Sequence, residues 1–121
     1  VDPERDGQAI LEALNLLAEA DHYPASLSGG MKKRAGLARA LSKKADIYLI
    51  DEPTAGQDAL HSEAVADAIR SYTSESLCIV STHDAELVAA VADEMVVFSS
   101  KCVALYPVTG RTADEIRCLM Q

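Results

Sequence analysis

The sequence predicts an α/β fold in which helices flank a parallel sheet, on three observations. Ile47–Ile50 is a short apolar run, with the length and composition of a strand buried on both faces. Ala59–Tyr72 carries apolar residues at helical spacing, and Leu77–Val80 is a second short apolar run. A strand, a helix and a strand in this order are typical of a right-handed parallel crossover.

The composition fits one globular domain. The chain has 121 residues, of which 49% are apolar, so a single core can form. A net charge of −8 argues against a nucleic-acid partner, because phosphate contacts require clustered Lys and Arg. Six of the eleven basic residues nevertheless gather in one segment, where we expect a solvated helix face: Lys32, Lys33, Arg34, Arg39, Lys43 and Lys44.

Neither the cysteines nor the apolar runs indicate secretion or direct membrane insertion. The three cysteines are widely spaced and form no CxxC pair, which is typical of reduced thiols in a cytosolic protein. No apolar run approaches the ~20 residues that span a bilayer, so a membrane role would come through a partner. The chain opens at Val1 rather than Met, and we therefore expect a fragment.

The first predicted helix runs from about Asp2 to Ala20. Asp2 is a favourable N-cap and Pro3 suits the first helical position. The polar and proline residues at His22–Pro24 would end this helix. Its inward-facing residues at helical spacing would be Ile10, Leu11, Leu14 and Leu17.

A glycine turn opens the second predicted helix, which we place at about Lys32–Leu41. The turn is Leu27–Met31, with the sequence LSGGM. The hydroxyl of Ser28, the flexible backbone of Gly29 and Gly30, and the positive end of the helix dipole favour an anion such as phosphate. A plain loop is the alternative.

Two carboxylates follow the first predicted strand. Asp51 and Glu52 come directly after Ile50, and Pro53 then breaks the run. Ligands of α/β sheets bind just beyond the carboxyl ends of parallel strands. One carboxylate there can hold Mg²⁺, and its neighbour can position an attacking water. Alternatively, these residues form only the polar turn that ends a strand.

A histidine is predicted at the same edge of the sheet. The second strand ends in the polar residues Ser81–Asp84. His83 would therefore lie beside Asp51 and Glu52, where it can hydrogen-bond a phosphoryl oxygen or a water. A structural role is the alternative for an isolated histidine. Asp58 would cap the helix between the two strands.

The sequence pattern of the last part of the chain predicts a hairpin followed by a helix. After a short helix capped by Asp84, the apolar runs Met95–Phe98 and Cys102–Tyr106 flank a polar turn, as in a β-hairpin. Thr112 and Glu115 have the spacing of a capping box, which begins a final helix.

The order of these motifs resembles the ATP-binding cassette family of transport ATPases over nearly the whole chain. Leu27–Met31 resembles the family's signature motif. Ile47–Asp51 resembles Walker B, with Glu52 in the place of the catalytic glutamate. Ala55–Asp58 resembles the D-loop, and Ser81–Asp84 resembles the loop of the switch histidine. The resemblance implies a P-loop NTPase-like parallel sheet with flanking helices, and ATP hydrolysis coupled to transmembrane transport.

The resemblance also implies ATP and Mg²⁺ as cofactors, with roles for three residues. Asp51 would hold Mg²⁺ through water. Glu52 would polarise the hydrolytic water, and His83 would contact the γ-phosphate.

Two protein partners are implied as well. Ser28, Gly29 and Gly30 would bind nucleotide held mainly by the second cassette of a head-to-tail dimer, and Asp58 would couple the two sites. The helix from about Asp2 to Ala20 would contact a transmembrane permease. The protein would thus be cytoplasmic and peripheral at the membrane.

Two residues depart from the usual family motifs. Met31 stands where the signature usually has Gln, and Gln57 stands where the D-loop usually has Leu. Together with Lys32–Arg34, both variants resemble the cassettes of MCE-associated lipid-trafficking transporters of bacteria and plastids.

The larger departure is that no G-x-x-x-x-G-K-[ST] loop, or Walker A, occurs in the sequence to cradle the β- and γ-phosphates. We therefore expect residues 1–121 to be the C-terminal portion of one cassette domain, neither well folded nor active alone. Residues 1–45 would form the helical subdomain and signature helix. Residues 46–121 would carry Walker B, the D-loop, the switch-histidine loop and the C-terminal hairpin and helix. The Walker A strand would lie beside Leu77–Val80.

Two other functions remain open on the sequence. A truncated interaction module could pair with a complete cassette through its signature face and do no chemistry, although the retained Glu52 and His83 argue against this. A non-transport cassette ATPase of DNA repair or chromosome structure is the second. The short spacing from Ser28 to Asp51 and the net charge favour transport instead.

Overall fold

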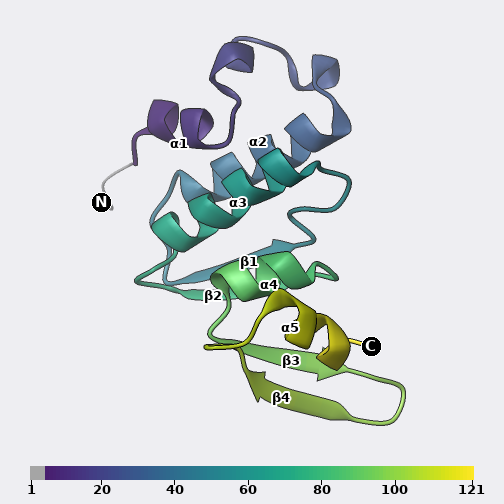
Figure 1. The fold of residues 1–121 in the computed structure, drawn as a ribbon. Coiled ribbons are helices and arrows are strands. Elements are labelled where there is room, and N and C mark those ends of the chain that lie inside the picture. The colour runs from purple at the N-terminus through teal and green to yellow at the C-terminus, as the bar shows by residue number, and fades with distance from the viewer. Residues whose placement is uncertain (1–4) are drawn as a thin grey trace.

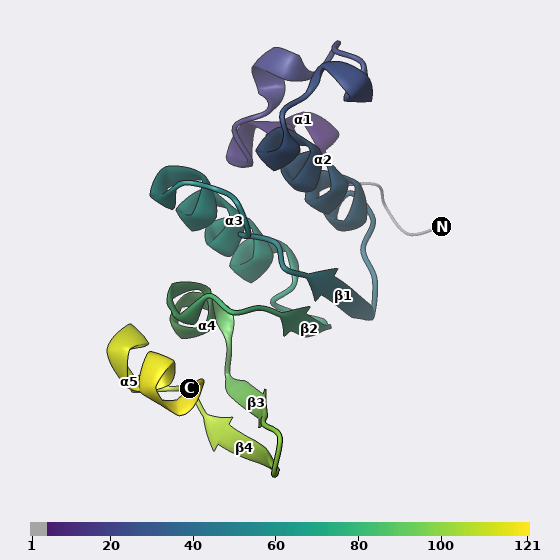
Figure 2. The same cartoon turned by 90° about the vertical axis from the view of Figure 1, so that its right-hand side faces the viewer.

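The computed structural model describes residues 5–121 as helices packed on one side of two small sheets (Figures 1 and 2). None of the helices in this range is both long and apolar enough to cross a membrane. In chain order, the helices and strands are α1 (Gly7–Ala13), two 3₁₀ turns (Leu17–Glu19 and Pro24–Ser26), α2 (Gly29–Leu41), β1 (Ile47–Asp51), α3 (Ala59–Tyr72), β2 (Leu77–Ser81), α4 (Ala85–Val91), β3 (Glu94–Phe98), β4 (Val103–Pro107) and α5 (Ala113–Leu119).

The predicted parallel crossover is confirmed. β1 and β2 pair in parallel, from Ile47 opposite Leu77 to Asp51 opposite Ser81, and α3 connects them. Their carboxyl ends are therefore level with each other, which brings the polar residues after both strands to one edge of the sheet.

The prediction that β1 is buried on both faces is wrong for the described chain. The side chain of Tyr48 is buried on the helix side, whereas Ile47, Leu49, Leu77 and Ile79 are between 54% and 76% exposed. Figure 2 shows why: α3, α4 and α5 all lie on one side of the strands. Within residues 5–121 no element covers the other side, so alternate apolar residues face solvent.

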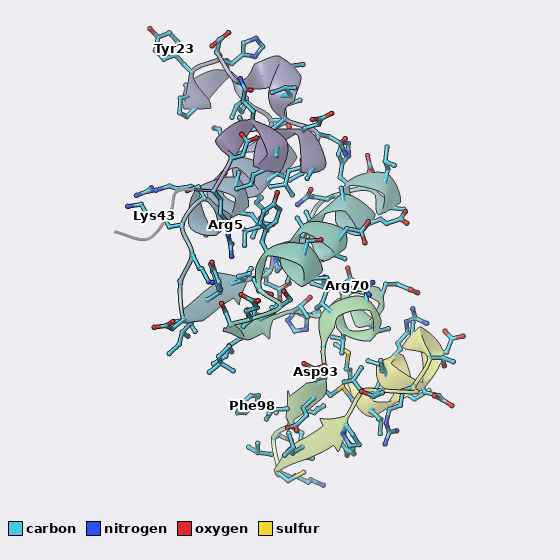
Figure 3. The ribbon with its side chains drawn as sticks, turned by 90° about the vertical axis from the view of Figure 1, so that its left-hand side faces the viewer. Arg5, Tyr23, Lys43, Arg70, Asp93 and Phe98 are labelled. Atoms are coloured by element: carbon cyan, nitrogen blue, oxygen red, sulfur yellow. The ribbon has the colours of Figure 1, made fainter. Side chains whose placement is uncertain are left out.

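β3 and β4 form the predicted antiparallel hairpin, which pairs Glu94 with Pro107 and Phe98 with Val103. Its inner face packs on α4 and α5 through a small core that includes Met95 and Ile116. Phe98 is 78% exposed, and Figure 3 shows it on the side of the hairpin away from α5. This second sheet therefore has one uncovered apolar face, as the first does.

The first helix is shorter than predicted. Asp2 and Pro3 lie outside the described residues, and α1 begins at Gly7 with Asp6 as its N-cap. It ends at Ala13 rather than near Ala20, because Asn15 adopts a left-handed backbone with φ of 56°. The main core includes Ile10, Leu14 and Leu16, all at most 2% exposed, whereas Leu17 is 44% exposed and does not face inward as predicted.

The predicted N-caps at Asp58, Asp84 and Thr112 are confirmed, whereas the predicted start of the second helix is wrong. α2 begins three residues earlier than expected, directly after Ser28, whose Oγ accepts the Met31 N–H at 3.2 Å. Asp58 begins α3, Asp84 begins α4, and Thr112 with Glu115 forms a complete capping box on α5.

A polar network joins the end of α2 to β1. The Arg5 guanidinium donates to the carbonyl of Leu41 and to the Tyr48 hydroxyl, each at 3.1 Å. That hydroxyl donates to the Lys43 carbonyl at 2.7 Å and accepts the Ala45 N–H at 3.0 Å. One buried phenol therefore fixes the connection from α2 into β1.

Replacing Tyr48 with Phe should lower the free energy of unfolding by about 1–3 kcal/mol. The groups that hydrogen-bond the Tyr48 hydroxyl would stay partly buried and would lose this partner. Urea unfolding followed by circular dichroism measures this change. Tyr23→Phe is the matched control, since Tyr23 is 84% exposed. Equal unfolding midpoints for the two variants would contradict the role of the Tyr48 network.

The cap of α3 predicts a pH effect. The pKa of Asp58 is lowered, first by the donated His61 backbone N–H and then by the His61 ring, whose Nδ1 lies 2.8 Å from Asp58 Oδ1. A lowered carboxyl pKa stabilises the fold above the ordinary pKa, and this contribution is lost as pH falls through the lowered value.

In His61→Ala, the Asp58 pKa should rise part of the way toward its usual value, because the backbone N–H remains. Carbon-13 NMR titration of the Asp58 carboxyl measures this shift. His22→Ala, at an exposed position, should leave the pKa of Asp58 unchanged. An identical Asp58 titration in His61→Ala and the wild type would contradict the contact.

Candidate functional site

The candidate site begins where β1 and β2 end together. Asp51 lies opposite Ser81, and the Ser81 hydroxyl donates to Asp51 Oδ1. The backbone N–H of Glu52 donates to the Ser81 carbonyl at 2.8 Å, which extends the pairing one residue beyond β1. The side chains that follow both strands are held at one edge as a result.

Glu52 and His83 meet at this edge. His83 Nε2 lies 3.5 Å from Glu52 Oε1, with the His83 side chain 96% exposed and that of Glu52 31% exposed. Glu52 has a left-handed backbone, with φ of 45°, so the chain turns out of the strand direction there. The Lys33 ammonium donates to the Glu52 carbonyl at 3.2 Å and ties this turn to α2.

An open cleft of about 460 Å³ lies beside this pair. Thr54 is 6% exposed, and its hydroxyl donates to Asp84 Oδ2 at 2.7 Å. The other oxygen of Asp84 caps α4, so one carboxylate holds the loop after β1 against the helix after β2. The lining residues of the cleft are Glu52, Thr54, Ala55, Gln57, Ser62, His83 and Asp84.

The predicted phosphate-binding turn lies outside the lining of this cleft. Ser28, Gly29 and Gly30 form the start of α2, and a Cβ added at Gly29 would meet nothing within 4 Å. Asp58 is likewise absent from the lining and is engaged with α3. The structure thus brings Glu52 and His83 together, with Asp51 directly before Glu52 at the end of β1, whereas the other predicted site residues do not line the cleft.

The oxygen donors at this edge suit a hard cation. Asp51 contributes a carboxylate and Ser81 a hydroxyl, side by side. In residues 5–121 there is no cluster of three His, Cys, Asp or Glu that could hold a metal by itself. Mg²⁺ needs few protein carboxylates, because water and substrate phosphates complete its octahedron. The donors therefore fit Mg²⁺ bound together with a phosphate ligand.

Several residues of the site were not predicted. Arg34 was assigned to a solvated helix face, but it is only 4% exposed, so that assignment is wrong. Its spacing from Leu37 and Leu41 could have revealed this, since all three share one helical face. Thr54 and Ser81 also escaped prediction, because their roles depend on contacts across the sheet edge.

Comparison with known proteins identifies the chain's relatives. The family model described as ABC transporter matches residues 2–55. The methionine import ATP-binding protein MetN of Thermobifida fusca is 34% identical over 110 residues, which is 89% of this chain and 33% of that protein. MetN of Burkholderia thailandensis is 39% identical over 108 residues, or 88% of this chain and 29% of that protein. The chain thus spans about a third of the length of these relatives.

Solved structures give the same assignment. A metal-chelate type ABC transporter in an inward-facing conformation superposes with a TM-score of 0.69 at 26% identity, covering 93% of this chain and 47% of that one. RNase-L Inhibitor superposes with a TM-score of 0.71 at 34% identity, covering 81% of this chain and 20% of that one. The P-loop NTPase-like fold is confirmed by these neighbours, and the chain belongs to the ABC transporter family.

Proposed function

We propose that the chain forms the C-terminal portion of an ATP-hydrolysing cassette that drives transmembrane transport. Residues 1–45 are the helical subdomain and signature helix. Residues 46–121 carry Walker B, the D-loop, the switch-histidine loop and the C-terminal hairpin and helix. The observation that carries this proposal is the 3.5 Å separation of Glu52 and His83 beside Asp51, at the carboxyl ends of two parallel strands.

Each of these side chains has a defined role in the proposed reaction. The Glu52 carboxylate accepts a hydrogen bond from the attacking water and orients it toward the γ-phosphate. His83, being exposed, can hydrogen-bond a phosphate oxygen there. Asp51 would hold Mg²⁺ through water, with the Ser81 hydroxyl beside it. The ion would supply positive charge to neutralise the charge that develops on the phosphates.

The unpaired edges and exposed faces of the strands support the proposal that the whole protein has a further segment packed against them. β2 pairs only with β1, and β3 pairs only with β4, within the described chain. The relatives are about three times longer than the matched segment. In our proposal, a Walker A strand pairs with the free edge of β2, and the rest of the missing segment covers Leu77 and Ile79 on the open face. The Walker A loop supplies the phosphate cradle that this sequence lacks, so residues 1–121 alone are inactive.

The signature turn supports a partner cassette. Ser28, Gly29 and Gly30 lie outside the cleft of their own chain, with open space above Gly29. They would therefore bind nucleotide held by a second cassette in a head-to-tail dimer, with Asp58 coupling the two sites. The helical subdomain would dock on a permease, which places the protein at the cytoplasmic side of the membrane. The resemblance of Met31 and Gln57 to lipid-trafficking cassettes stays a prediction.

Glu52→Gln in the whole protein should lower ATP turnover by about 10²–10⁴-fold, because the amide cannot act as a general base. Nucleotide binding should survive, because the substitution leaves the phosphate-binding groups in place. Steady-state phosphate release and binding of a fluorescent ATP analogue measure the two effects. Glu63→Gln is the matched control, since Glu63 is exposed on α3.

A different outcome would reject the catalytic assignment. Equal turnover in Glu52→Gln and the control would exclude Glu52 as the group that orients water. A whole wild-type protein that binds a complete cassette but never turns over ATP would point to the non-catalytic interaction module instead.

A further inference from the structure

The side chain of Gln57 connects α2 to the loop after β1. Arg34, on α2, donates from Nη1 to Gln57 Oε1 at 3.1 Å. Gln57 in turn donates from Nε2 to the carbonyl of Pro53 at 2.6 Å. One amide thus accepts from a helix and donates to the residue directly after Glu52. We call this contact pair, Arg34 to Gln57 to Pro53, the amide bridge.

The amide bridge lies against the signature turn. Arg34 follows Gly30 by four residues on α2, so both are on the same helical face. A Cβ added at Gly30 would lie 3.7 Å from Arg34 Nη1 and 3.7 Å from Gln57 Cγ. Gln57 also lines the cleft that contains Glu52 and His83. The bridge therefore spans from the turn to the cleft within one chain.

The burial of Arg34 makes this contact hard to replace. Arg34 is 4% exposed, and its Nε has no hydrogen-bond partner among residues 5–121. Within the same range, Gln57 Oε1 provides the guanidinium with its hydrogen-bond acceptor. A buried cation strongly retains an acceptor, because losing it leaves the charge without compensation. Gln57 is held in one orientation as a consequence, and the loop backbone at Pro53 is held with it.

We propose that Arg34 and Gln57 are positioning residues, which set the place of the loop 52–58 relative to the signature turn of the same chain. Neither residue touches the reacting atoms. They act through the Pro53 carbonyl on Glu52, its neighbour in the sequence. This inference rests on the proposed ATPase function for its kinetic consequence, but the placement of the loop can be measured without turnover.

The test uses the whole protein with Gln57→Met, which keeps the approximate side-chain size and removes both polar contacts. Because small misplacements of catalytic groups are costly, kcat should fall between about 10-fold and 10²-fold, with KM for ATP unchanged. Gln57→Glu keeps an acceptor for Arg34 but removes the Nε2 donor to the Pro53 carbonyl, so its kcat should stay low if the bridge acts through Pro53. Arg39→Leu is the matched control, because Arg39 is exposed on the same helix.

A double-mutant cycle separates coupling from general damage. If the bridge acts as a unit, Arg34→Leu combined with Gln57→Met should lower kcat no further than the worse single variant. Additive losses, or a wild-type kcat in Gln57→Met, would overturn the proposal.

Amide hydrogen exchange gives the readout that is independent of turnover. The amides of Glu52 and of residues 54–58 should exchange faster in Gln57→Met than in Arg39→Leu or the wild type. If this occurs and the wild type shows no ATP turnover, the bridge stands and the proposed function fails. Unchanged exchange across the variants would overturn the bridge whatever the turnover.

Discussion

The parallel pairing of β1 with β2 is the constraint on which the candidate site depends. The register sets Asp51 opposite Ser81, and the residues that follow both strands therefore emerge at the same level. A slip of one residue would turn every side chain of a strand to the other face and would separate Glu52 from His83. The same register also places Tyr48 in the core on the helix side, while Ile47 and Leu49 are exposed on the other side. One register therefore serves both the packing of the core and the geometry of the site.

The residues that leave β1 are held by groups from several helices as well as by the sheet. Lys33 of α2 binds the carbonyl of Glu52, and Asp84, the cap of α4, binds the hydroxyl of Thr54. Asp58, at the end of the same loop, caps α3. A loop that contacts α2, α3 and α4 has little freedom to move by itself. A displacement of any one of these helices would therefore change the position of Glu52. The site is thus an assembly of secondary-structure ends.

The parts of the fold that were predicted correctly have local signals. The two parallel strands, the hairpin and the caps at Asp58 and Thr112 depend on patterns only a few residues long. The end of α1 depends on one left-handed residue, Asn15, in a segment whose apolar spacing continues as if it were helical. The hydrogen-bond partner of Arg34 lies on a loop more than twenty positions away in the sequence. Whether a strand face is exposed depends on which other segments pack against it. The sequence of the strand itself carries no information about those segments.

The left-handed backbone at Glu52 has a consequence for selection. A non-glycine residue in this conformation costs about 1–2 kcal/mol, and only Gly and, to a lesser degree, Asn adopt it readily. Selection of variants for thermal stability would therefore favour Glu52→Gly, while selection for phosphate release would restore the carboxylate. Position 52 is a place where the two pressures act in opposite directions, so a library screened for heat resistance alone would enrich stable proteins without the water-orienting group.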